Sequence, residues 1–144
     1  MLKNKIFLTQ TDTTIGFVSQ DANKLSNIKQ RPSHKHYIKA VNSFETLKTF
    51  TRVPRKHKNR VRRAKKTTFI MPNSHSYRVI YDKHHLQLIN RLKWAYTTSA
   101  NLSGKNYDEH FARTEADIII KPLSINNKAS KIYKLGLTGL KRIR

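Results

Sequence analysis

The chain has 144 residues and carries 30 lysines and arginines against 8 aspartates and glutamates, a net charge of +22. This length suits one domain with a packed core, and we expect a single domain over residues 1–144. No apolar run approaches the roughly 20 residues of a membrane span, and the N-terminus has no signal-peptide pattern. With no cysteine in the sequence, disulfides and thiolate metal sites are excluded, which fits a cytoplasmic protein.

The charge predicts a polyanionic partner. A domain this basic binds polyanions through phosphate contacts and counterion release, so we expect nucleic acid rather than a membrane. Nine cations and no acid crowd into residues 52–66, and such a run is either solvated or lies on phosphate. The candidate RNA-binding residues in this run are Arg55, Lys56, Arg60, Arg62, Arg63 and Lys65.

The first third of the chain predicts two strands around a helix. Residues 6–8 predict a buried strand, and the polar stretch 9–16 that follows is rich in hydroxyls. Asp21 can cap a helix, which must end before Pro32 because proline disfavours helix in the residue before it. Residues 37–41 predict the next strand.

Two short helices are expected ahead of and within the basic run. Asn42 with Glu45 resembles a capping box, which would open a short amphipathic helix. Pro54 suits the first turn of a further helix.

The second half of the chain predicts a hairpin and further mixed elements. Strands at 67–71 and 77–81 flank a turn and form the hairpin. A helix over 84–92 leads into a strand that ends at Tyr96. The remaining predicted elements are a helix at 109–113 and strands at 116–120 and 132–135. Because strands and helices mix without strict alternation, we predict an α/β fold with a twisted, mixed parallel and antiparallel open sheet flanked by helices.

A loop of small polar residues is expected after that strand, from Thr97 to Gly104. Such a loop brings hydroxyls, an amide and backbone N–H groups to one place, and ligands of open α/β sheets collect at the carboxyl ends of strands. The alternative interpretation is an ordinary polar turn.

Several catalytic chemistries have no signature in this chain. The seven histidines show no HExxH spacing, so we expect no metal site and expect imidazoles on the surface or facing phosphate. The P-loop and GxSxG patterns are also missing, and acids are too sparse for a paired-carboxylate mechanism. What remains is a site that acts by positioning and charge stabilisation. Its candidate residues are the cations Lys29, Arg31 and Lys35 and the donors Ser99, Asn101 and Ser103.

The order of three motifs carries a resemblance to a known family. They are Thr11-Asp12-Thr13, then Lys29-x-Arg31-Pro32-x-x-Lys35, then Thr98-Ser99-Ala100-Asn101-x-Ser103-Gly104. In this order they resemble the YrdC-like family of L-threonylcarbamoyladenylate synthases. Residues 129–133 resemble that family's Pro-Ser-x-Ile-Val segment, and the likeness runs from about Phe7 to Arg144.

The resemblance implies a nucleotidyltransferase. L-threonine, bicarbonate and ATP, with Mg²⁺ accompanying the triphosphate, would give threonylcarbamoyl-AMP and pyrophosphate for tRNA threonylcarbamoyladenosine modification, with partner proteins of that pathway possible. By analogy, the catalytic residues that hold phosphates and carbamate are Lys29 and Arg31. The substrate-binding residues would be Thr11, Thr13, Thr14, Lys35 and Arg78, the last gripping a carboxylate. The nucleotide-binding residues would be Ser99, Asn101, Ser103 and Ser130.

Departures from the family pattern keep other hypotheses open. Gln10 replaces the proline before Thr-Asp-Thr, Ile15 replaces an aromatic residue, and residues 64–66 replace a Pro-Gly-Pro loop. These changes fall on the pocket wall and the ATP loop. The alternative is a protein of the same fold that binds double-stranded RNA, tRNA or rRNA without catalysis. A third hypothesis is an unrelated or ribosome-associated basic protein.

Overall fold

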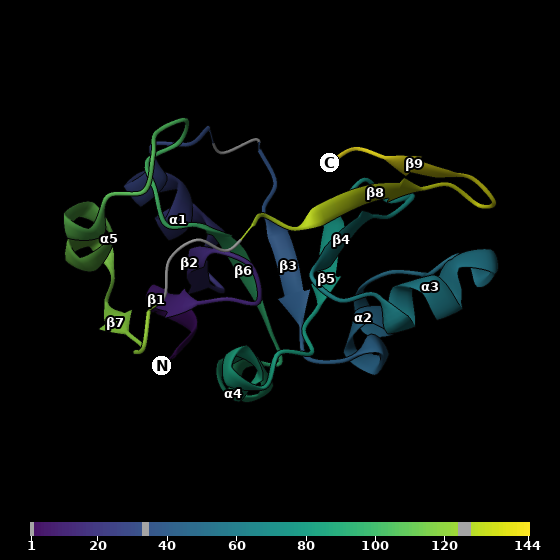
Figure 1. Ribbon diagram of the computed structural model, residues 1–144, viewed down its shortest axis with the longest axis horizontal. Coiled ribbons are helices and arrows are strands. Elements are labelled where there is room, and N and C mark those ends of the chain that lie inside the picture. The colour runs from purple at the N-terminus through teal and green to yellow at the C-terminus, as the bar shows by residue number, and fades with distance from the viewer. Residues whose placement is uncertain (1, 33–34, 124–127) are drawn as a thin grey trace.

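A mixed sheet runs through the molecule from end to end (Figure 1). The computed structural model describes residues 2–32, 35–123 and 128–144. Its strands are β1 (Phe7–Gln10), β2 (Ile15–Ser19), β3 (Ile38–Val41), β4 (Thr67–Ile70), β5 (Ser76–Val79), β6 (Trp94–Ser99), β7 (Ile118–Ile119), β8 (Lys131–Leu135) and β9 (Leu140–Arg142). They lie in the order β7-β1-β2-β6-β3-β5-β4-β8-β9, with parallel pairs β1–β7, β3–β5 and β4–β8. The predicted fold class is confirmed.

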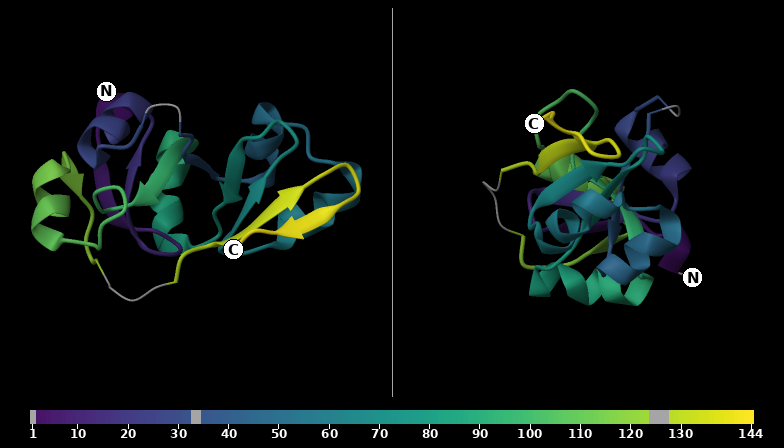
Figure 2. Two further views of the ribbon diagram at one scale, coloured as in Figure 1. Left: turned by 90° about the horizontal axis from the view of Figure 1, so that it is seen from above. Right: turned by 90° about the vertical axis from the view of Figure 1, so that its right-hand side faces the viewer.

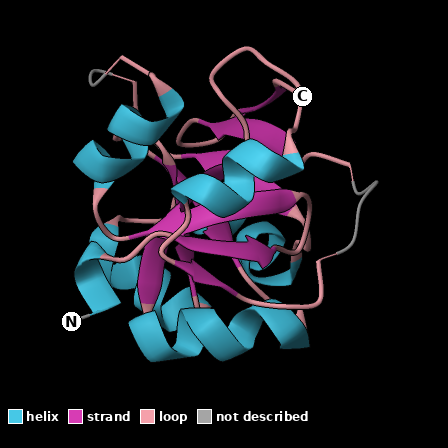
Figure 3. Cartoon of the chain, turned by 90° about the vertical axis from the view of Figure 1, so that its left-hand side faces the viewer, coloured by secondary structure: helices cyan, strands magenta, loops and turns pink. Residues whose placement is uncertain are grey.

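Helices cover both faces of this sheet (Figure 3). They are the 3₁₀ turns η1 (Leu2–Asn4) and η2 (Arg55–His57) and the α-helices α1 (Ala22–Lys29), α2 (Phe44–Phe50), α3 (Lys58–Arg63), α4 (Lys83–Leu92) and α5 (Glu109–Glu115). Helix α5 lies with β7 at one end of the molecule, and α3 lies with β9 at the other (Figure 2). None of the helices in the described ranges has the length and apolarity to cross a membrane.

Side-chain alternation divides the core between the two faces. On one face α4 buries Leu88 and Ile89 against Ala40 and Ala95 of the central strands. On the other face, α1 and α2 bury Leu25 and Leu47 in two separate clusters. Since successive strand residues point to opposite faces, the neighbours of Ala40 and Ala95 along their strands face α1 and α2.

The observed N-terminal cap matches the one predicted from the sequence in α1 and differs from it in α2. The Asp21 carboxylate accepts a hydrogen bond from Lys24 N at 3.0 Å, so the predicted cap of α1 is confirmed. The predicted capping box of α2 is wrong, because the cap is Ser43, whose hydroxyl accepts from Thr46 N at 3.1 Å. Ser43 takes the extended backbone conformation that a cap requires. The Asn42 amide oxygen accepts from the Thr46 hydroxyl instead.

Strand β6 is longer than predicted, which moves the polar loop. Thr97 and Thr98, predicted to lie in a loop, pair with Val18 and Phe17 of β2, because β-branched residues suit a central strand. The two strands come close at Gly16, where a Cβ would lie 2.8 Å from the Thr98 carbonyl oxygen. The strand therefore delivers Ser99 to its carboxyl end, and the loop begins at Ala100.

The prediction that the imidazoles lie on the surface or face phosphate is wrong for two histidines. His57 and His85 are 2% and 1% exposed. Neither ring nitrogen of His85 has a hydrogen-bond partner among the described residues. Burial, followed by the neighbouring Arg78 charge, lowers the pKa of His85 to about 3 from 6.5.

This histidine is expected to make the protein sensitive to acid. Because the unfolded state binds the His85 proton below about pH 6.5 and the folded state only near pH 3, the free energy of unfolding falls as pH falls between these values. The loss attributable to His85 approaches about 1.4 kcal/mol per pH unit. Denaturant titrations of the wild type and His85→Leu at neutral pH and at about pH 5 measure it. A wild type whose pH dependence equals that of His85→Leu would contradict the prediction, and the exposed His110→Leu serves as the control.

Candidate functional site

A cavity of about 340 Å³ opens at the carboxyl end of β6. It gathers six of the predicted site residues from five parts of the chain. They are Thr13, Thr14, Arg31, Arg78, Ser99 and Ser130. The described residues of its lining include no carboxylate, so the cavity is suited to an anion.

Arg31 is one of the arginines that line this cavity. Its Nη2 donates to the His36 carbonyl at 2.9 Å, and its guanidinium carbon lies 4.8 Å from the Tyr37 ring centroid. Its Nε is buried and has no hydrogen-bond partner in the part of the chain that the structure describes. The hydrogen bond and the ring contact hold the Arg31 side chain in place.

Lys29 supports the cavity from behind rather than lining it. Its ammonium donates to the Ser99 carbonyl at 2.8 Å, to the Asn101 carbonyl at 2.7 Å and to the Asn101 side-chain oxygen at 3.3 Å. Its own carbonyl accepts from Ser103 N at 3.0 Å. Burial, and after it the Arg31 charge, lower the pKa of Lys29 to about 8. Lys29 therefore ties the end of α1 to the polar loop.

Arg78 already has a carboxylate partner inside the protein. Its Nε lies 3.2 Å from Asp12 Oδ1, and the two side chains are 4% and 3% exposed. Burial raises the pKa of Asp12 more than Arg78 lowers it, and burial also lowers the pKa of Arg78. The Arg78 Nη1 donates to the Thr68 hydroxyl at 3.3 Å.

A second arginine joins this network and was missed in the sequence. The Thr68 hydroxyl lies 2.8 Å from the Ser130 hydroxyl. Arg144 Nη2 donates to that same Ser130 hydroxyl at 3.2 Å, and Arg144 Nε donates to the Ser130 carbonyl at 2.9 Å. Arg144 lines the cavity, and in the sequence it was only the end of a basic tail.

The other predicted site residues do not line the cavity. Thr11 is buried and shapes the β1–β2 turn, with its hydroxyl donating to the Thr14 carbonyl at 2.6 Å. Lys35 is exposed and lines a neighbouring cavity of about 490 Å³. The Asn101 side-chain nitrogen donates to the carbonyls of Leu102 and Lys105, and Ser103 is exposed.

The candidate RNA-binding residues are all exposed, but they form two groups. The larger group lies on η2 and α3 at the end of the molecule opposite α5 (Figure 1). It consists of Arg55, Lys56, Arg60, Arg62 and Arg63. Lys65 instead lines a cavity of about 630 Å³ beside the first, together with Lys66, Lys128, Lys131, Arg142 and Arg144.

Metal-ligating residues do not cluster in the described ranges. Within residues 2–32, 35–123 and 128–144, no group of three or more His, Asp or Glu side chains could hold a metal ion.

Comparison with known proteins identifies related chains. A family model, Sua5_yciO_yrdC, described as "Telomere recombination", matches residues 1–135. The uncharacterized protein MG259 of Mycoplasma genitalium is 30% identical over 148 aligned residues, which cover 94% of this chain and 31% of MG259.

Solved structures share the fold at low sequence identity. Sua5 of P. abyssi complexed with L-threonine superposes with a TM-score of 0.81 at 19% identity, covering 97% of this chain and 50% of Sua5. E. coli YciO superposes with a TM-score of 0.72 at 17% identity, covering 97% of this chain and 82% of YciO. The chain thus spans under a third of MG259 and half of Sua5.

Proposed function

Because the chain belongs to the Sua5/YciO/YrdC family, we propose that it acts as an L-threonylcarbamoyl-AMP synthase, converting L-threonine, bicarbonate and ATP to threonylcarbamoyl-AMP and pyrophosphate. The observation that carries the proposal is the meeting of Arg31, Arg78 and Ser99 around one cavity without a carboxylate. Each substrate carries a negative charge, and guanidinium groups bind carboxylate and phosphate through paired donors. A family neighbour was solved in complex with L-threonine, which supports the same substrate here.

The residues that line the cavity would bind different parts of the substrates. Arg31, which lines the cavity, would bind the phosphates, while Arg78, held by Asp12 and Thr68, would direct its remaining donors to the threonine carboxylate. The hydroxyls of Thr13, Ser99 and Ser130 supply hydrogen bonds from the surrounding wall. Catalysis here consists of positioning and of stabilising the negative charge that develops on the phosphoryl oxygens.

Mg²⁺ enters this proposal as part of the nucleotide substrate. Mg²⁺ prefers oxygen ligands and keeps several waters, commonly binding through substrate phosphates. The described lining of the cavity offers hydroxyl oxygens but no carboxylate, and the nearby Asp12 is paired with Arg78. The triphosphate and water would therefore supply most of the ligands.

Arg31→Ala is expected to reduce threonine-dependent pyrophosphate release by at least about a hundredfold, the scale seen when one donor to a developing charge is removed. The measurement is pyrophosphate release from ATP with and without L-threonine and bicarbonate. Arg55→Ala, which removes an exposed arginine outside the cavity, is the matched control and is expected to keep wild-type activity. A wild-type protein that releases no pyrophosphate in response to threonine would refute the proposal.

RNA binding is the second candidate function, and the exposed cations of η2 and α3 favour it. No acid lies within residues 52–66, so these charges are not consumed by local ion pairs. Glu45, on α2, forms its ion pair with Lys48 instead. Exposed cations of this density favour phosphate contacts.

Reversing the charges of Arg60, Arg62 and Arg63 to Glu is expected to flatten the salt dependence of RNA binding, lowering the slope by about one for each phosphate that these arginines neutralise. Fluorescence anisotropy of a labelled tRNA transcript across a salt series gives this slope. An unchanged slope would count against η2 and α3 as the contact surface. The same substitutions are expected to leave pyrophosphate release intact, which separates the two functions.

A further inference from the structure

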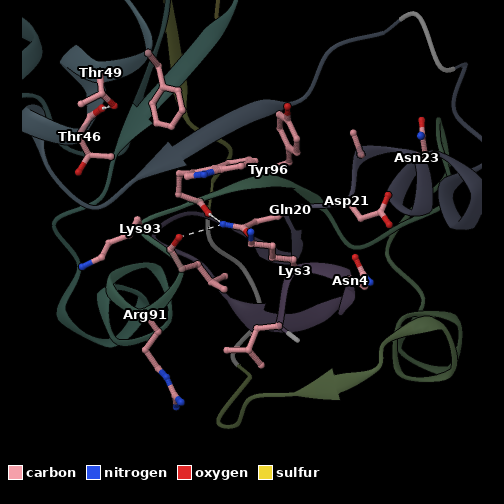
Figure 4. Close-up of a pocket in the computed structure, with 15 residues that line it drawn as sticks. Lys3, Asn4, Gln20, Asp21, Asn23, Thr46, Thr49, Arg91, Lys93 and Tyr96 are labelled. Atoms are coloured by element: carbon pink, nitrogen blue, oxygen red, sulfur yellow. Dashed lines mark hydrogen bonds between the residues drawn. The ribbon is translucent and has the colours of Figure 1, made fainter.

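A groove on the α1 and α2 face of the sheet lies outside the candidate site. Two cavities of about 1050 and 490 Å³ form it, and they share Ala22, Asn23, Phe50 and Tyr96 in their linings. We call this the sheet groove. Figure 4 shows the larger cavity, with Tyr96 at its centre, Asp21 and Asn23 of the α1 region on one side and Thr46 and Thr49 of α2 on the other.

The strand register shows which side chains form the floor of the sheet groove. Lys39 of β3 pairs with Tyr96 of β6 on one side and with Tyr77 of β5 on the other. Residues that pair across strands point to the same face, so these three side chains form a row across the sheet. Trp94, two residues before Tyr96, lies on that face as well.

Aromatic rings dominate this floor and remain partly exposed. Trp94 meets Tyr96 edge to face at 5.2 Å between ring centroids and meets Phe50 at 5.9 Å. The Tyr37 ring lies 6.3 Å from that of Tyr96. Phe50, Trp94 and Tyr96 are each half-buried, so part of each residue remains open to solvent.

The charges around the groove are almost all positive. The Lys39 ammonium lies 4.1 Å from the Phe50 ring centroid and 4.5 Å from that of Trp94, and burial lowers the pKa of this lysine. Exposed cations line each cavity: Lys3, Arg91 and Lys93 line the larger, and Lys35 lines the smaller. The described lining of the smaller cavity has no carboxylate, and that of the larger has only Asp21, which caps α1.

The groove adjoins the candidate site. His36 and Tyr37 line both the smaller cavity of the groove and the cavity of about 340 Å³. A ligand confined to the site would not contact Trp94, which does not line that cavity.

We propose that the sheet groove binds single-stranded RNA, with unpaired bases stacking on Tyr96, Trp94 and Phe50 and backbone phosphates lying on Lys35, Lys39 and Lys93. Sequence-tolerant binding of single strands combines a cationic groove with aromatic stacking surfaces, which is the combination found here. A duplex is the poorer fit, because its bases stack on each other and cannot lie on rings at the floor of a groove. The proposal goes beyond the synthase function, since these rings and lysines do not line the cavity that holds Arg31.

The test uses the full chain and a labelled oligouridine of about 12 nucleotides, within the site sizes typical of such grooves. Tyr96→Leu is expected to weaken binding about tenfold with an unchanged salt slope, because it removes a stacking surface and no charge. Tyr96→Phe, which keeps the ring, is expected to bind as the wild type does. Lys39→Gln is expected to lower the salt slope by about one, the value for a single phosphate.

Matched controls lie elsewhere on the surface. Tyr107 is 39% exposed and lines neither cavity of the groove, so Tyr107→Leu is expected to have no effect, and Lys105→Gln serves likewise for charge. Circular dichroism spectra that match the wild type would show that the variants fold.

Two outcomes would overturn the inference. One is a folded Tyr96→Leu that binds oligouridine as tightly as the wild type. The other is an RNA duplex of the same length that binds more tightly and loses affinity equally in Tyr96→Leu. If only the charge reversals on α3 weaken RNA binding, the groove is excluded while RNA binding itself stands. Pyrophosphate release tests the synthase function independently of either result.

Discussion

Arg78→Met is expected to lower the free energy of unfolding by about 3–5 kcal/mol, the cost of removing one partner from a buried ion pair. The substitution leaves the Asp12 carboxylate buried with no cation beside it, and it also removes the donor to the Thr68 hydroxyl. Denaturant titration at neutral pH measures the loss. The loss is expected to shrink as pH falls, because burial raises the pKa of Asp12 and a protonated Asp12 needs no counter-charge.

A double-mutant cycle separates the ion pair from simple loss of packing. Asp12→Leu combined with Arg78→Met removes both charges, and the double variant is expected to be more stable than the sum of the two single losses predicts. Arg113→Met, which breaks the exposed pair of Arg113 with Glu109, is the control, with an expected loss under about 1 kcal/mol. Equal losses for Arg78→Met and Arg113→Met would contradict the assignment.

Lys29→Met is expected to cost about 2–4 kcal/mol, on the scale of buried acceptors that lose a charged donor. The side chain is 2% exposed, and its ammonium serves both carbonyls at Ser99 and Asn101 and the Asn101 side chain. Methionine fills similar space but donates nothing, so these acceptors would remain unsatisfied. Denaturant titration gives the free energy, and hydrogen exchange is expected to show faster exchange at Ser103 N, which bonds to the Lys29 carbonyl.

Lys105→Met provides the control for this prediction, because Lys105 directly follows the polar loop and is exposed to solvent. A loss below about 0.5 kcal/mol for Lys29→Met, within the range of ordinary surface substitutions, would show that the loop is held by other interactions.

Local sequence patterns predicted most of the helices and strands. The hairpin of β4 and β5 formed where a proline-containing turn separates two β-branched and aromatic runs, and α1 begins at Ala22, directly after its predicted cap Asp21. The wrong predictions fall where two neighbouring residues can both cap a helix, or where strand pairing decides whether a residue lies in a strand or a loop. Asn42 and Ser43 can both cap a helix, and Thr97 and Thr98 suit a strand as well as a loop.

The sequence predicted only part of the residues that line the candidate cavity, and it did not predict their contacts. Motif order selected Arg31, Ser99 and Ser130, and the structure brings them to one cavity. The sequence did not reveal that Lys29 holds the loop from behind or that Arg78 pairs with Asp12. Arg144 had no local signal, since it reaches the cavity only because β8 pairs with β4 and β9 returns alongside β8.

Composition and motif order alone determined that the chain is strongly basic and which family pattern it follows. The tertiary structure decided which cations line the cavity, which form ion pairs inside the protein, and that half-buried rings line a groove beside the site. The physical reason is that charge and motif are properties of the chain itself, whereas burial and pairing arise between residues such as Asp12 and Arg78, which are distant in sequence and meet only when the sheet forms.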